Sequence, residues 1–336
     1  MKNLNVNDRI GGEAVINSKG RNNLKTNIGM IYRKYGILLI FIIMFIISAM
    51  ANKDFLKPQN LINIVRQNAT ITILACGMTM LIISGMIDLS GGASLTLAGC
   101  MAAGIMATTK SLPLAILVGL SMGAAIGWVN GLLVTKFRLQ PFIATLAMMN
   151  VANGILQIYT GGSPIIGIGN MKFFGQGYIG PVPVPIIIML LLIIVTWGVL
   201  KYTKLGLYTY AIGGNEKATV ASGINVNRMK RMIFMVHGLL VGIAGIVLMG
   251  RLNSGQPSVA SAGYEFDAIV AVIVGGTSFT GGIGGVVGTL IGALIVGMIN
   301  NILVLMNVPT MYQLVVKGML IAGAVILDMK TRARKV

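Results

Sequence analysis

Long stretches without a charged residue dominate this chain and restrict the folds open to it. They cover residues 35–52, 67–87, 89–109, 111–135 and 268–316. A helix that spans a bilayer needs about 20 mostly apolar residues, and a helix satisfies its own backbone polar groups where water is absent. The chain is 55% hydrophobic and only 10% charged, with a mean hydropathy of +0.85, unlike a soluble domain. These features predict an all-α membrane protein.

Prolines and glycines divide the apolar runs into about ten predicted spans. Pro113, Pro141 and Pro185 stand near helix starts, where a missing N–H costs little. The run 268–316 is too long for one span, so we expect a break near "GGTSFTGGIGG" (275–285). The predicted spans are 36–52, 67–87, 91–109, 113–135, 141–160, 182–200, 230–250, 265–280, 284–304 and 309–327.

The basic residues lie unevenly about these spans. With the N-terminus placed in the cytoplasm, 19 of the 26 Lys and Arg residues fall on the cytoplasmic side and six fall outside. This asymmetry is the positive-inside pattern of membrane proteins, so the net charge of +18 does not indicate a nucleic-acid partner. We predict a single transmembrane domain, 35–328, between two cytoplasmic tails, 1–34 and 329–336.

The sequence lacks the residues that several kinds of chemistry require. The chain has no Gly-Lys dipeptide and therefore no phosphate-binding loop of the ATPase kind. Its one histidine, His237, is expected to bond a neighbouring helix, and the sequence shows no acidic partner near it. Cys76 and Cys100 lie in predicted spans and are expected to be small packing residues. We therefore predict no catalytic residue and no metal site.

The connection 201–229 is the longest on the predicted cytoplasmic side. Within it, Asn215 is a good N-cap residue, Glu216 follows at the positive end of the helix dipole, and Gly223 is a good helix terminator. The helix between them is too short to be stable alone in water. We expect docking to order it, either onto its own membrane domain or into a partner, with Ala218 and Ala221 on its small face.

Two ionisable residues at membrane depth raise the question of a path or a gate. Asp88 ends one apolar run beside Ser90 and two glycines. It either caps the next helix, by accepting N–H bonds from Ser90 and Gly91, or lines a path for a hydroxylated solute. Lys317 lies in the last predicted span, where it either extends to the membrane surface or serves the path.

Neutral amides also lie inside the predicted spans. They are Asn130, Asn150, Asn153, Asn300 and Asn301. Most such amides bond neighbouring helices, and a few could offer hydrogen bonds to a neutral sugar. Asp88, Ser90, Asn150, Asn300 and Lys317 are therefore the candidate translocation-path or gate residues.

Four blocks in order resemble the ribose-type permeases, which are transmembrane subunits of bacterial ATP-binding-cassette (ABC) sugar importers. They are "IDLSGG" (87–92), "GGNEKATVASGIN" (213–225), the stretch 263–297 and "YQLVVKGMLIAGAVILD" (312–328). The resemblance runs from about Asn60 to the C-terminus. Met86, Gly91, Ala93 and Val220 depart from the family's usual residues.

The resemblance implies a function and its partners. It implies a type II-importer-like arrangement in the bacterial plasma (inner) membrane, pairing with a second copy of the chain, and surrounding lipid. It also implies an extracytoplasmic sugar-binding protein that delivers a monosaccharide, with ribose the expected sugar. A separate cytoplasmic subunit would hold ATP and Mg²⁺, so this chain would bind no cofactor and would be no enzyme itself. The role of coupling to that ATPase would fall on Gly214, Asn215, Glu216, Ala218, Ala221 and Gly223.

Two other functions remain open at this point. An ion-coupled secondary sugar transporter would need intramembrane acids, for which Asp88, Glu265 and Asp267 are the available residues. A membrane-embedded enzyme would need a nucleophile–base pair or a metal-ligand set, and the sequence offers neither.

Overall fold

The computed structural model describes residues 36–309 and, beyond them, 311–313, 315, 316, 318, 319, 322, 323 and 326. The regular structure of this part of the chain is helical apart from one two-stranded hairpin and an isolated bridge between Ile165 and Gly255. The long helices are Gly36–Ala51, α2 (Pro58–Ile83), α3 (Gly91–Thr109), α4 (Leu112–Thr135), α5 (Pro141–Thr160), α7 (Val184–Tyr202), α10 (Val226–Leu252) and α12 (Val286–Leu305).

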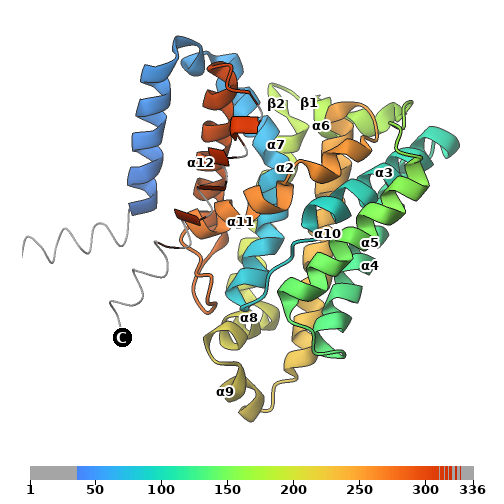
Figure 1. Cartoon of the computed structure of the whole chain (residues 1–336), viewed down its shortest axis with the longest axis vertical. Helices are drawn as coiled ribbons and strands as arrows, with labels where there is room; N and C mark the ends of the chain where they lie inside the picture. Colours follow the sequence, from blue (N-terminus) through green and yellow to red (C-terminus); the bar gives the residue numbers. More distant parts are fainter. Residues whose placement is uncertain are drawn as a thin grey trace, which may run out of the picture.

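Shorter elements join the long helices. They are η1 (Lys53–Leu56), η2 (Gly169–Lys172), α6 (Phe173–Gln176), β1 (Tyr178–Ile179), β2 (Val182–Pro183), α8 (Lys204–Gly214), α9 (Glu216–Ala221), η3 (Pro257–Ser261) and α11 (Tyr264–Val274). The antiparallel strands pair Tyr178 with Pro183 and Ile179 with Val182. The β1–β2 hairpin and helices α8 and α9 lie at opposite ends of the molecule (Figure 1). We call these ends the hairpin end and the hook end.

Six helices of the described residues are long and apolar enough to cross a membrane: α3, α4, α5, α7, α10 and α12. The helix Gly36–Ala51 is apolar but shorter. Helix α2 begins nine residues before its predicted start, and its first turns carry polar residues such as Asn63, Arg66 and Asn68. The predicted span 309–327 falls partly on residues outside the described part. The number of spans, about ten, therefore stays a prediction, whereas the all-helical membrane fold is confirmed.

One predicted span is wrong in its extent. We expected a helix over 265–280, but α11 ends at Val274 after 11 residues. Gly276, Gly281 and Gly282 adopt positive φ angles of 84°, 88° and 76°, which L side chains rarely adopt, so the helix cannot continue. The segment 275–285 is therefore an irregular loop, and the predicted break at this glycine-rich stretch is confirmed.

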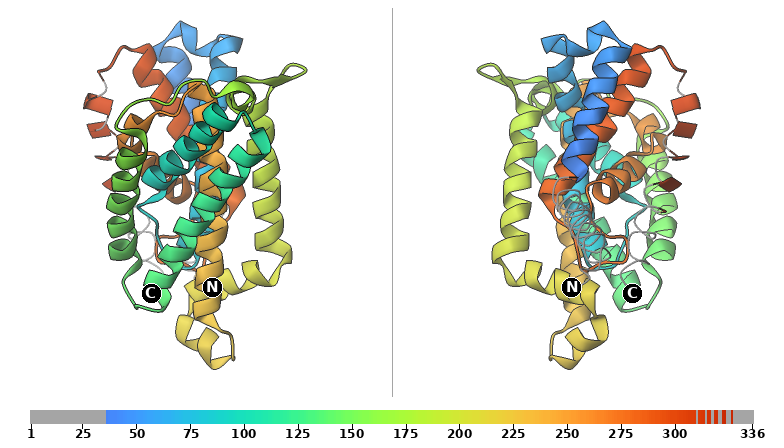
Figure 2. Two further views of the ribbon diagram at one scale, coloured as in Figure 1. Left: turned by 90° about the vertical axis from the view of Figure 1, so that its right-hand side faces the viewer. Right: turned by 90° about the vertical axis from the view of Figure 1, so that its left-hand side faces the viewer.

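The core lies where α2, α3, α4 and α10 meet. Helix α10 packs along α4, α3 and α2, and residues 68–83 of α2 are all buried. By contrast, the outward faces of α5 and α7, which stand on opposite flanks in Figure 2, expose large apolar side chains such as Ile158 and Ile194. Exposed apolar faces on helices of this length suit contact with lipid.

A stripe of glycines lets α4 and α10 approach closely. Every fourth residue of α4 between positions 119 and 131 is glycine: Gly119, Gly123, Gly127 and Gly131. A Cβ on Gly123 would overlap the carbonyl oxygen of Gly238 on α10, and one on Gly127 would overlap that of Phe234. Small residues at a helix interface allow the backbones to touch, which is the usual way of packing helices in membranes.

Candidate functional site

The predicted short helix of the 201–229 connection is present, and it projects from the end of the molecule. The segment 204–225, here called the hook, contains α8, α9 and the turn before α10 (Figure 1). The Asn215 side chain caps α9 by accepting from the N–H of Ala218 at 3.0 Å, and Gly223 ends it with a φ of 79°. Both cap predictions are thus confirmed, whereas helix α8 was not predicted.

All six residues of the predicted coupling set lie on the surface of the hook. Gly214, Asn215, Glu216, Ala218, Ala221 and Gly223 are exposed. Only Thr219 of α9 is buried, and Glu216 pairs with Lys230 of α10 at 2.7 Å. An exposed ion pair of this kind contributes less than about 1 kcal/mol. The hook is therefore held by its own cap and by one ion pair, and its surface is accessible to a partner.

Backbone atoms alone form the contact between the hook, near the end of α8, and the membrane domain. The N–H of Gly282 in the 275–285 loop donates to the carbonyl of Ile83, the last residue of α2, at 2.7 Å. Gly213 of the hook fits against both, and a Cβ on it would overlap the Ile83 oxygen. We call this contact between Ile83, Gly213, Gly281 and Gly282 the glycine junction. No side chain separates the three segments, so the hook, the end of α2 and the 275–285 loop are in direct backbone contact.

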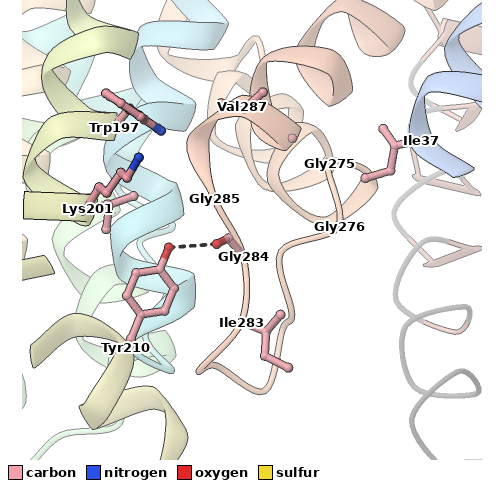
Figure 3. Close-up of a pocket in the computed structure, with 12 residues that line it drawn as sticks. Ile37, Trp197, Lys201, Tyr210, Gly275, Gly276, Ile283, Gly284, Gly285 and Val287 are labelled. Carbon is pink, nitrogen blue, oxygen red and sulfur yellow. Dashed lines mark hydrogen bonds between the residues drawn. The ribbon is translucent and has the colours of Figure 1, made fainter. Parts of the chain in front are cut away.

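A tyrosine adds a second link between the hook and the 275–285 loop. The hydroxyl of Tyr210 on α8 donates to the carbonyl of Gly284 at 2.8 Å (Figure 3). Burial raises the pKa of Tyr210 above its ordinary value of 10.0, so the hydroxyl keeps the proton that it donates. Beside this bond, Trp197, Lys201 and the glycines of the loop line a cavity of about 580 Å³.

The turn between α2 and α3, also at the hook end, holds a buried polar cluster. Oδ1 of Asp88 accepts from the Ser90 N–H at 2.7 Å and from the Ser90 hydroxyl at 2.6 Å. Asn130 of α4 donates to Oγ of Ser90 at 3.0 Å, and Nε2 of His237 on α10 lies 3.1 Å from Oδ2 of Asp88. All four side chains are buried. This Asp88 cluster therefore ties the turn to α4 and α10.

Two expectations about this cluster need correction. The sequence shows no acid near His237, yet the fold brings Asp88 to it from 149 positions away. The predicted bond from the Ser90 N–H to Asp88 is present, but Ser90, and not Asp88, is the N-cap residue of α3, so Asp88 supports the cap from outside the helix. Gly77 of α2 makes room for the histidine, since a Cβ there would overlap Nδ1 of His237.

The other candidate path residues do not join the Asp88 cluster. Asn150 lies on the exposed face of α5 and donates to the carbonyl of Leu146 in its own helix at 3.2 Å. Asn300 lies toward the hairpin end of α12, and Lys317 lies outside the described residues. The structure thus brings together only Asp88 and Ser90 of the five.

A cavity of about 270 Å³ opens near the hairpin end, among α2, α10, α11 and α12. We call it the amide cavity, because Gln67, Asn68, Asn300, Asn301 and Gln313 all line it, together with Arg251, Tyr264 and Asp267. Asn300 and Asn301 were predicted as amides that could bond a sugar, and Asp267 was considered only for an ion-coupled transporter; the other lining residues were not expected to be functional. The polar residues in the first turns of α2 were the signal in the sequence that could have indicated this cavity. Within the described residues, no group of His, Cys, Asp and Glu could hold a metal ion.

Comparison with known proteins places the chain among permeases. The family model described as branched-chain amino acid transport system / permease component matches residues 60–325. The ribose import permease protein RbsC of Bacillus subtilis is 48% identical over 306 residues, which cover 90% of this chain and 95% of that protein. RbsC of Escherichia coli K12 is 45% identical, covering 87% and 92% of the two chains. The L-arabinose transport system permease protein AraH of E. coli K12 is 36% identical, covering 89% and 92%. No solved structure matches.

Proposed function

Because this chain belongs to the family of branched-chain amino acid transport system permease components, we propose that it is the transmembrane subunit of an ABC importer for a monosaccharide, ribose. The chain is a multi-pass integral protein of the bacterial plasma membrane. The family model's description names amino acids, but the relatives at 45% and 48% identity are named ribose permeases. The arabinose permease is more distant, at 36%, and this difference favours ribose.

The exposed, capped hook is the observation that carries the mechanism. A passive permease needs a surface through which another subunit can move it, and α9 presents one at the hook end. The glycine junction and the Tyr210 bond would transmit a push on α9 to the end of α2 and to the 275–285 loop. The force would come from a separate cytoplasmic subunit that holds ATP and Mg²⁺.

This assignment places the hook end in the cytoplasm. The basic residues support that orientation, because many of them gather there: Lys136, Arg138, Lys201, Lys204, Lys217, Arg228, Lys230 and Arg231. The N- and C-terminal tails would then lie in the cytoplasm as well. The hairpin end would face an extracytoplasmic sugar-binding protein, and a second copy of the chain would complete the path across the bilayer.

The hook assignment is tested by reversing a charge. Glu216→Arg puts two positive charges together at the Lys230 contact and changes the surface offered to the ATPase. We expect co-purification of the ATPase subunit to fall about tenfold, equal to about 1.4 kcal/mol of binding free energy, with membrane insertion unchanged. Asp54→Arg is the matched control, because Asp54 is also exposed and pairs with a lysine, Lys57 at 2.6 Å, at the opposite end.

Two outcomes contradict the proposal. One is normal co-purification of the ATPase with the Glu216→Arg protein. The other is ribose uptake by vesicles, containing the chain with its ATPase and binding protein, that a protonophore abolishes while ATP is held constant. The second result would favour an ion-coupled secondary transporter instead.

A further inference from the structure

The amide cavity has the form of a binding site, and it lies away from both the hook and the Asp88 cluster. It lies where the first turns of α2 and the last turns of α12 meet the end of α10 and the start of α11. Its volume of about 270 Å³ is at the lower end of the range for small-molecule sites, about 300–1,000 Å³. The cavity therefore suits a guest of monosaccharide size and excludes larger solutes.

Asn68 carries an acceptor that the protein leaves unused. Its side chain is only 2% exposed, and its Nδ2 donates to the carbonyl of Ala293 on α12 at 2.6 Å. Because a carbonyl can only accept, the nitrogen must face Ala293, and the oxygen is fixed as the other atom. Oδ1 of Asn68 has no hydrogen-bond partner among the described residues. An unsatisfied buried acceptor costs about 1–3 kcal/mol, and this oxygen is covered by its neighbours, so Asn68 shapes the cavity wall through its bond to Ala293 and offers no exposed acceptor.

The surroundings hold Asn68 and its neighbours in place. Gly297 of α12 faces the Asn68 amide, and a Cβ there would press on it. Nη1 of Arg251 donates to the backbone carbonyl of Gln67 at 3.1 Å, and Nη2 donates to the Tyr264 hydroxyl at 3.4 Å. Arginine has five N–H donors in all, so these two bonds orient the guanidinium without exhausting it. The cavity is thus preorganised before any guest enters.

The chemistry of the lining selects a neutral polyhydroxyl guest. An amide side chain both donates and accepts, as a hydroxyl does, and five amide residues line the cavity. Arg251 and Asp267 contribute one charge of each sign, so the lining has no excess of either sign that would favour a charged guest. The ring of Tyr264 offers an apolar face for the carbon side of a sugar.

We propose that the amide cavity is a monosaccharide-binding site of the permease itself, occupied by the sugar on its way from the hairpin end into the bundle. The proposal rests on the proposed function for the class of solute. It adds that the permease selects its solute through Arg251, Tyr264 and Asn300, and does not leave selection to the delivering protein alone.

Thiol labelling of the purified full chain tests occupancy directly. Asn300→Cys places a thiol in the cavity, while the natural Cys76 and Cys100 are buried. We expect about 100 mM ribose, which saturates a site with a dissociation constant of about 1 mM, to slow labelling by a water-soluble thiol reagent at least threefold. Ile166→Cys is the control, because Ile166 is 77% exposed outside the cavity, and its labelling should not respond to ribose. Equal rates with and without ribose at position 300 would overturn the proposal.

Transport by the complete complex separates this proposal from the proposed function. Asn300→Leu should lower ATP-dependent ribose uptake at least fivefold while ATP hydrolysis stimulated by the binding protein stays within twofold, and Asn300→Gln should restore part of the uptake. Asn63→Leu makes the same change on α2 at the same end, at a residue that does not line the cavity, and should match wild type. Uptake by Asn300→Leu equal to that of Asn63→Leu overturns the cavity proposal, whereas a wild-type complex that takes up no ribose overturns the proposed function.

Discussion

Replacing Asp88 tests how much stability the buried cluster at the hook end contributes. Asp88 is 2% exposed and accepts two bonds from Ser90 while its other oxygen faces His237. Asp88→Ala removes every one of these contacts and leaves buried donors without an acceptor. Each buried donor left without an acceptor costs about 1–3 kcal/mol, so losing both bonds from Ser90 should cost about 2–6 kcal/mol. Asp88→Asn keeps an oxygen for both bonds from Ser90 and places a nitrogen toward His237, so its cost should be about 1 kcal/mol.

The two variants should therefore separate clearly in a thermal assay. In a protein of this size, 1 kcal/mol corresponds to a shift of about 2 °C in the melting midpoint. We expect the midpoint of the purified protein in detergent, followed by the loss of its native peak in size-exclusion chromatography, to fall by about 4–12 °C for Asp88→Ala. For Asp88→Asn the fall should be about 2 °C.

A double-mutant cycle shows whether His237 belongs to the same unit. Because the two side chains touch, the effects of Asp88→Ala and His237→Ala should not add. The reasoning is refuted if the Asp88→Ala protein has the same melting midpoint as wild type, or if the midpoint of Asp88→Asn falls as far as that of Asp88→Ala. Ribose uptake by Asp88→Asn then decides between the two interpretations of Asp88: a support for the α3 cap tolerates the change, whereas a path that needs the charge does not.

Three glycine substitutions, two of them compared with a control, test the contacts that the backbone makes. Gly123→Val should lower the melting midpoint by about 5 °C or more, because its Cβ would overlap the α10 backbone, while Gly154→Val on α5, with open space around it, should leave the midpoint unchanged. Gly213→Ala should lower ribose uptake at least fivefold by forcing the glycine junction apart, and Gly198→Ala on α7, whose Cβ meets nothing, should not. Gly223→Ala should weaken ATPase co-purification several-fold, since alanine at a φ of 79° costs about 1 kcal/mol; unchanged binding would show that the end of α9 is not part of the contact.

Local signals in the sequence were sufficient to predict the helices and the hook. The boundaries of α5 (Pro141–Thr160) were predicted to the residue because a proline starts the helix and a glycine follows it. Helix α9 was predicted from Asn215 and Gly223, whose capping effects act within one turn. The segment 265–280 was misjudged, because its apolar residues run on past the glycines that end the helix.

The contacts between distant segments were decided only by the tertiary structure. Asp88 meets His237, and Gly213 meets Gly282, because α2, α8, α10 and the 275–285 loop converge. The amide cavity likewise needs four helices at one place. In a membrane helix such as α3, apolar residues cover every face, so hydrophobic periodicity does not indicate which face meets which neighbour. The sequence by itself determined which segments are helical and where they stop, since those choices depend on neighbouring residues. Which residues touch depended on how closely the helices approach and how they are rotated, and that is set by packing between glycines and side chains far apart in the chain.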